Sequence, residues 1–95
     1  MSEFTVPRPN LYESSQGYSV EILGRTGLRY IEGGTKLFVD SEILAEPGGI
    51  LVYRDSIRSW DPQGAVVPLS EAARARVVDN ICAALGSHGI AVDVI

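Results

Sequence analysis

Residues 70–86 read SEAARARVVDNICAALG, and they hold the one clear helical pattern in this chain. Ser70 is a good N-cap, because a serine hydroxyl can accept a backbone N–H of the first turn. Apolar residues recur every four positions through the segment, at Ala73, Val77, Ile81 and Leu85. This spacing predicts an amphipathic helix with one buried stripe. Gly86 is expected to be the C′ residue that ends it.

Arg74 is the anomaly of this helix, because helical geometry places it near the middle of the apolar stripe. One explanation is that its guanidinium reaches solvent over the start of the helix. The other is that it pairs with a carboxylate of the sheet, such as Asp55 or Asp61, since a buried charge must be paired.

Short segments of strand-like alternation precede the helix. Strands are expected over residues 18–23, 28–32 and 36–40, and the Gly33-Gly34 pair between the last two suits a tight hairpin turn. These segments are predicted to form an antiparallel meander. Shorter strands are expected over residues 50–53 and 57–60, with a β-turn over residues 61–64.

The two ends of the chain complete the predicted architecture. Pro7 and Pro9 lack backbone donors, so residues 1–17 are expected to be an irregular N-terminal segment, in which any strand is short or at an edge. Residues 90–95 form a final strand that docks into the sheet. The fold class is therefore α+β: a mostly antiparallel sheet of short strands, one amphipathic helix packed on one face, and a C-terminal strand. The other face must be solvated or covered by a partner.

Length and composition limit the class of protein. The chain has 95 residues, which predicts a single domain over 1–95, and it is 45% hydrophobic and 21% charged, as in ordinary globular proteins. The net charge of −4 and the absence of a basic run argue against nucleic-acid binding. No apolar stretch is long enough to span a membrane, and the first residues do not resemble a signal peptide. With a lone cysteine, Cys82, these features predict a cytoplasmic protein.

Catalytic, cofactor and metal sites are poorly supported by the residues present. His88 is the only histidine, and a position near a helix C-terminus gives it a sufficient structural role. One histidine and one cysteine cannot make a zinc site, and Asp40 with Glu42 lacks the spacing of a calcium loop. The chain is therefore predicted to be non-enzymatic, with no cofactor and no metal.

The segment from Tyr53 to Pro62 holds the best candidates for partner binding. It contains the only tryptophan and two arginines, residue types that are enriched at binding hot spots. The candidate partner-binding residues are Arg54, Asp55, Arg58, Trp60 and Asp61. The alternative is that Trp60 closes one end of the core while the charged residues form a solvated ion-pair edge.

Residues 48–95 resemble a family of predicted bacterial immunity proteins, number seventy-four of the polymorphic-toxin immunity series. The resemblance is carried by Gly49, Tyr53, Asp55-Ser56-Ile57, Trp60-Asp61-Pro62, Ser70 and Ile81. It implies a non-enzymatic protein that binds and neutralises a toxin protein. The acidic balance fits this function, since many toxins that act on nucleic acid are basic.

Two alternatives remain open. The first is a structural or regulatory module that self-associates, as a homodimer through a sheet edge. The second is a small uncharacterised enzyme, a hydrolase or transferase that uses Asp55, Arg58 and His88.

Overall fold

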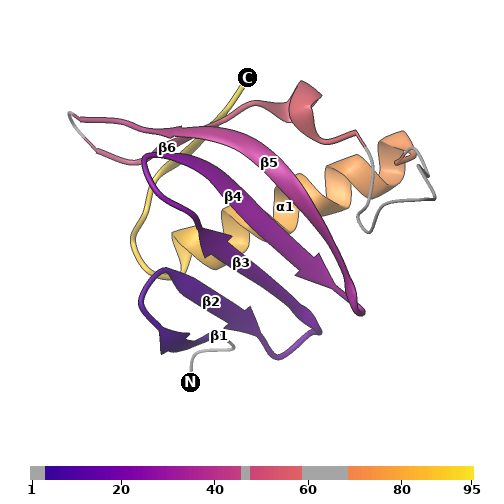
Figure 1. Ribbon diagram of the computed structural model, residues 1–95, viewed down its shortest axis with the longest axis horizontal. Helices are drawn as coiled ribbons and strands as arrows, with labels where there is room; N and C mark the ends of the chain where they lie inside the picture. Colours follow the sequence, from indigo (N-terminus) through magenta and orange to yellow (C-terminus); the bar gives the residue numbers. More distant parts are fainter. Residues whose placement is uncertain (1–3, 46–47, 59–68) are drawn as a thin grey trace.

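The computed structural model describes residues 4–45, 48–58 and 69–95, in which seven strands form one sheet with a single α-helix (Figure 1). The strands follow the sheet in chain order: β1 (Phe4–Arg8), β2 (Leu11–Ser14), β3 (Tyr18–Ile22), β4 (Thr26–Glu32), β5 (Thr35–Ile43), β6 (Ile50–Val52) and β7 (Val92–Val94). A short 3-10 helix, η1 (Arg54–Ser56), follows β6, and the α-helix α1 (Glu71–Gly86) lies between η1 and β7. The α+β prediction is confirmed.

Neighbouring strands from β1 to β6 pair antiparallel, whereas β6 and β7 pair parallel. The parallel pair follows from connectivity, because α1 carries the chain back along the sheet before β7 begins. The predicted meander is β3–β4–β5, and the Gly33-Gly34 turn between β4 and β5 has positive φ at both glycines. The predicted last strand does dock into the sheet, beside β6.

One face of the sheet packs against α1, which crosses behind the strands in Figure 1 and contacts β2, β3 and β7. The predicted stripe is confirmed, since Val77, Ile81 and Leu85 are fully buried. From the sheet, the inward side chains with no more than 2% exposure are Val20, Leu28, Tyr30, Leu37, Val39 and Val52. Burying one side chain such as Ile81 contributes about 1.5–3 kcal/mol. The core is therefore confined to the space between α1 and this face.

The start of α1 follows the sequence prediction, and it also explains Arg74. The backbone N–H of Ala73 donates to Ser70 Oγ at 3.1 Å. Arg74 Nε donates to the carbonyl oxygen of Ile57 at 2.9 Å, and its Nη1 pairs with Glu71. The buried part of the guanidinium is thus satisfied by a backbone carbonyl and by a carboxylate of the same helix, not by Asp55. Asp61 lies outside the described residues.

The C-terminal end of α1 differs from the prediction at Gly86. Gly86 is the last residue of the helix, and Gly89 takes the left-handed conformation, with φ of +76°. Ile90 N–H donates to Leu85 O and Gly89 N–H donates to Gly86 O, both at 3.0 Å. This pair of bonds is a Schellman motif with Gly89 at C′. Ile90, which follows, packs on the core, so the helix end also aims the chain toward β7.

The N-terminal segment was predicted to be irregular, with any strand short or at an edge; residues 4–14 are not irregular, but their two strands are short and β1 lies at the edge. They form the β1–β2 hairpin, with Pro9 and Asn10 in the turn and Asn10 at φ of +70°. Proline followed by a residue of positive φ suits a type II turn. Pro7 is tolerated because, within the described residues, β1 pairs only with β2 and lies at the sheet edge.

The predicted strand over residues 57–60 is also wrong where the structure describes it. Residues 54–56 form η1, and Ile57 and Arg58 are not in a strand. Ser56 explains the turn, because its Oγ accepts the Asp40 N–H at 2.8 Å and donates to Tyr53 O at 2.6 Å. Ile57 then enters the core with no exposed surface. The β-turn predicted over residues 61–64 lies outside the described residues.

Two glycine substitutions test which residue ends α1. Gly89→Ala should lower the free energy of unfolding by about 1 kcal/mol, because alanine pays for the left-handed conformation. Gly86→Ala should raise it by about 0.5 kcal/mol, because Gly86 is helical and a Cβ there meets nothing within 4 Å. Urea unfolding of both variants measures the two changes, and equal destabilisation by both would contradict the assignment.

Candidate protein-binding face of the sheet

Of the sequence-predicted binding residues, the described ones (Arg54, Asp55 and Arg58) lie near the start of the helix, in and next to η1. Arg54 Nη2 pairs with Glu71 Oε2 at 2.9 Å, and the exposed Arg58 donates its Nε to Asp55 O at 3.0 Å. In a regular strand Arg54 and Arg58 would lie on the same face, but η1 interrupts that alternation. Trp60 and Asp61 lie outside the described residues.

The residues of the enzyme alternative are not brought together. Asp55 and Arg58 lie by the start of α1, whereas His88 follows its end. A helix of 16 residues is roughly 24 Å long. His88 instead packs against Tyr12 with ring centroids 4.7 Å apart and ring planes inclined at 51°, and its Nδ1 lies 2.9 Å from Ser87 Oγ. The length of α1 therefore separates His88 from Asp55 and Arg58, and this distance is too large for the three side chains to act directly in one reaction.

The other features to consider in the described residues are a reactive thiol, a metal site and a membrane-spanning helix. Burial raises the pKa of the Cys82 thiol, and the nearby Asp79 carboxylate adds to the rise, so the thiolate is disfavoured. In the described part of the chain, no three His, Cys, Asp or Glu side chains form a group that could hold a metal ion. No helix among the described residues is long and apolar enough to cross a membrane.

A polar network closes the sheet–helix boundary at the β4 side of α1. Tyr30 Oη donates to Glu32 Oε1 at 2.6 Å and accepts from Asn80 Nδ2 at 2.8 Å, while Arg76 Nη2 pairs with Glu32 Oε2 at 3.0 Å. Burial raises the pKa of Tyr30, and so does its bond to Glu32. Burial would also raise the pKa of Glu32, but the bonds from Tyr30 and Arg76 lower it further than burial raises it. Glu32, Arg76 and Asn80 also line a hollow of about 290 Å³ together with Gln16 and Tyr18.

The face of the sheet away from α1, called here the open face, carries an ordered row of side chains. Strand register aligns five residues across β1 to β5: Arg8, Leu11, Glu21, Arg29 and Phe38. Glu21 pairs with Arg8 at 2.6 Å and with Arg29 at 3.0 Å. The hydrogen bond from Arg8 is the main reason that the pKa of Glu21 lies below its usual range. The row is thus held by one carboxylate between two guanidinium groups.

Phe38 ends this row and is 54% exposed, a large exposure for an aromatic side chain. Its ring lies over Gly27, where a built Cβ would fall 2.6 Å from Phe38 Cε2. Gly27 sits in a β-bulge, with φ of +91°, and its N–H donates to the buried Ser41 Oγ at 3.0 Å. The bulge therefore leaves a side-chain-free site on β4 over which the ring can lie.

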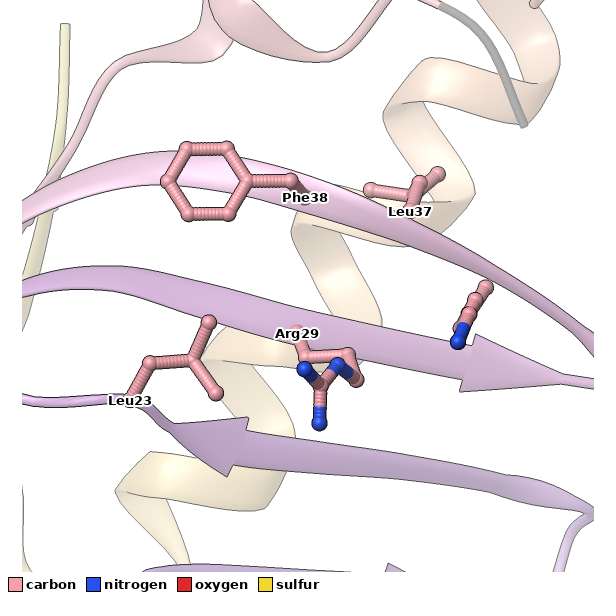
Figure 2. Close-up of a pocket in the computed structure, with 5 residues that line it drawn as sticks. Leu23, Arg29, Leu37 and Phe38 are labelled. Carbon is pink, nitrogen blue, oxygen red and sulfur yellow. The ribbon is translucent and has the colours of Figure 1, made fainter. Parts of the chain in front are cut away.

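A hollow of about 140 Å³ opens beside the ring on this face (Figure 2). Its lining residues are Leu23, Arg29, Lys36, Leu37 and Phe38, and we call it the open-face hollow. Figure 2 shows Phe38, Leu23 and Arg29 on the side of the strands away from the helix. The hollow thus combines apolar surface with two cationic side chains.

Phe38 was not among the sequence-predicted binding residues, although the strand predicted over residues 36–40 contains a signal for its exposure. Leu37 and Val39 are two positions apart in this strand, and both are buried. Strict alternation then puts Phe38 on the opposite face, where a polar residue is the usual choice. Arg29 and Leu23 could not have been found this way, because their meeting with Phe38 depends on the register across β3, β4 and β5.

The bulge can be tested with a matched pair of glycines. Gly27→Ala should lower the free energy of unfolding by about 2–3 kcal/mol, from backbone strain and from collision with the Phe38 ring. Gly34→Ala introduces a similar backbone strain, since Gly34 has φ of +82°, but its added Cβ would meet no atom within 4 Å. It should therefore lower the free energy of unfolding by about 1 kcal/mol. In a Phe38→Ala background, the cost of Gly27→Ala should fall to that of Gly34→Ala. An unchanged cost in that background would refute the contact.

The ion pairs of Glu21 should make part of the stability depend on pH. A lowered pKa means that the contribution is complete above the unfolded carboxyl pKa of about 4.3 and fades as pH falls through the folded value. Glu21→Gln should therefore lower the free energy of unfolding by about 1 kcal/mol at neutral pH and by much less at about pH 3. Glu13→Gln is the control, because Glu13 is exposed on the same face and forms no ion pair within the described residues. Denaturant unfolding at both pH values decides, and a loss independent of pH would contradict the electrostatic origin.

Residues 19–95 match the family model described as Immunity protein 74. Searches of the curated proteins and of the solved structures give no match to this chain. The matched residues run from the second residue of β3 to the end of the chain, so they include the open-face hollow, η1 and α1 but not the β1–β2 hairpin. Because the match spans well over half of the chain, the protein belongs to the Immunity protein 74 family.

Proposed function

We propose that this protein neutralises a bacterial toxin by binding it, without catalysing a reaction. Membership of an immunity-protein family is the observation that carries the proposal. The dispersed positions of Asp55, Arg58 and His88 support it, because they offer no assembled nucleophile and base. Binding would take place in the cytoplasm, where the toxin would otherwise act.

The charge of the chain fits a toxin with a basic surface. The net charge is −4, and opposite net charges accelerate the association of two proteins. Two regions are candidates for the contact: the segment from Tyr53 to Pro62, which the sequence predicted, and the open face of the sheet.

Capture followed by growth rescue tests the proposal. A tagged chain is used to retain proteins from a lysate of the source bacterium, and each retained protein is then expressed in a laboratory bacterium. At least one should arrest growth when expressed alone, and co-expression of the chain should restore growth. The full chain is used in place of a truncated one, because both candidate regions depend on the intact sheet.

Three other outcomes would count against toxin neutralisation. They are retention of no protein, retention of proteins that do not affect growth, and a toxic protein against which the chain gives no protection. Retention of the chain alone would favour the self-associating module, and sedimentation equilibrium would then show a mass that rises with concentration.

A further inference from the structure

We propose that the open-face hollow is the central toxin contact, and that it receives an apolar side chain flanked by a carboxylate. This inference rests on the proposed function and specifies the chemistry of the partner. It differs from the sequence prediction, which placed the contact around η1.

The apolar part of the argument is the position of Phe38. Exposed large apolar side chains within the described residues are Val6, Leu23, Phe38, Ile43 and Ile95. Of these five, Leu23 and Phe38 line one hollow. Aromatic residues are enriched in the buried centres of protein interfaces, where they lose little entropy on binding. Because the ring already lies over Gly27, a partner would meet an apolar surface that is held in place before binding.

The charged part of the argument is the lining of the same hollow. It contains Arg29 and Lys36 and no acidic residue, although the chain as a whole carries a net charge of −4. Arg29 gives one Nη to Glu21, and 43% of its side chain remains exposed. Lys36 is exposed and forms no ion pair within the described residues. A carboxylate placed in the hollow would complement both cations.

The size and charge together select a protein as the occupant. The volume of about 140 Å³ is small beside the roughly 300–1,000 Å³ of small-molecule sites. Nucleic acid would need more clustered cations and would be repelled by the net charge of the chain. A side chain of leucine or phenylalanine beside aspartate or glutamate satisfies both the apolar wall and the cations.

Net charge and local charge act at different distances, so they do not conflict. A basic toxin would be attracted by the acidic molecule over about one Debye length, roughly 8–10 Å at ordinary ionic strength. Contact would then depend on the groups that touch. A carboxylate on the surface of a basic protein would bind at the hollow in preference to the acidic remainder of the surface, because the hollow carries two cations.

The first test measures affinity for the toxin identified by growth rescue. Phe38→Ala should weaken binding about 30-fold, as expected for a hot-spot side chain. Ile43→Ala is the matched control, because Ile43 is 50% exposed on the same strand but is not part of the hollow. Lys36→Glu should weaken binding at least as strongly, whereas Arg58→Glu reverses an exposed cation next to η1 and should change affinity less. Each variant is first shown to unfold cooperatively.

The outcomes separate this inference from the proposed function. Loss of affinity in Trp60→Ala or Arg58→Glu, with Phe38→Ala unchanged, would overturn the hollow and leave toxin binding intact. Equal weakening by Phe38→Ala and Ile43→Ala would also overturn it. Failure to find any toxin would count against the proposed function and would leave the second test to decide on the hollow.

The second test uses a defined probe in place of the toxin. N-acetyl-leucyl-glutamate amide is titrated into the labelled chain and followed by amide chemical shifts, with the leucyl-glutamine analogue as the uncharged control. Shifts should concentrate at residues 23, 29, 36 and 38, occur with the acidic peptide, and be lost in Lys36→Glu. No shift at about 10 mM peptide, where a millimolar site would be largely filled, would overturn the proposed chemistry.

Discussion

The whole fold depends on one packing constraint: a single helix must cover the apolar face of a seven-stranded sheet. Val77, Ile81 and Leu85 meet the sheet as one fully buried stripe, and the inward residues of β3, β4 and β5 complete that core. Because α1 packs on that side, the opposite face of the sheet has no element of the described chain packed over it (Figure 1). That face must therefore be stable in water, and the row of Arg8, Glu21 and Arg29 shows how much of it is polar.

Phe38 departs from that polarity, as Leu23 beside it does, and its side chain is the more exposed of the two. A β-bulge costs regular pairing, and here it places Gly27 beneath the ring with its N–H satisfied by Ser41. Bulges often re-aim a side chain near functional surfaces. A ring that is more than half exposed gains less from burial than it would in the core, so its retention on this face is easier to explain by contact with a partner than by stability alone.

The sequence predicted the parts of the fold that are governed by local periodicity and failed where tertiary context decides. The Ser70 cap, the four-residue apolar spacing of α1 and the meander all depend on near neighbours, so they could be predicted. The β1–β2 hairpin was missed because Pro7 argues against a strand until its position at the sheet edge is known. Gly89 was overlooked in favour of Gly86 because either glycine could end a helix, and the Schellman bonds that choose between them appear only in three dimensions. The hollow was missed for the same reason: Leu23, Arg29 and Phe38 lie on three strands, and register brings them together.

Family membership and geometry constrain different parts of the function. The family match gives the class of protein but names no partner. The geometry, in contrast, contributes a distribution of charge: an acidic molecule with a small cationic and aromatic hollow on its uncovered face. In an interface of this kind the association rate and the choice of partner depend on different groups. Net charge accelerates the approach of the partner, and the side chains of the hollow determine which partner binds on contact. Side chains on the open face contribute little to the core, so substitutions there would change the proposed contact while leaving the packing of α1 on the sheet intact.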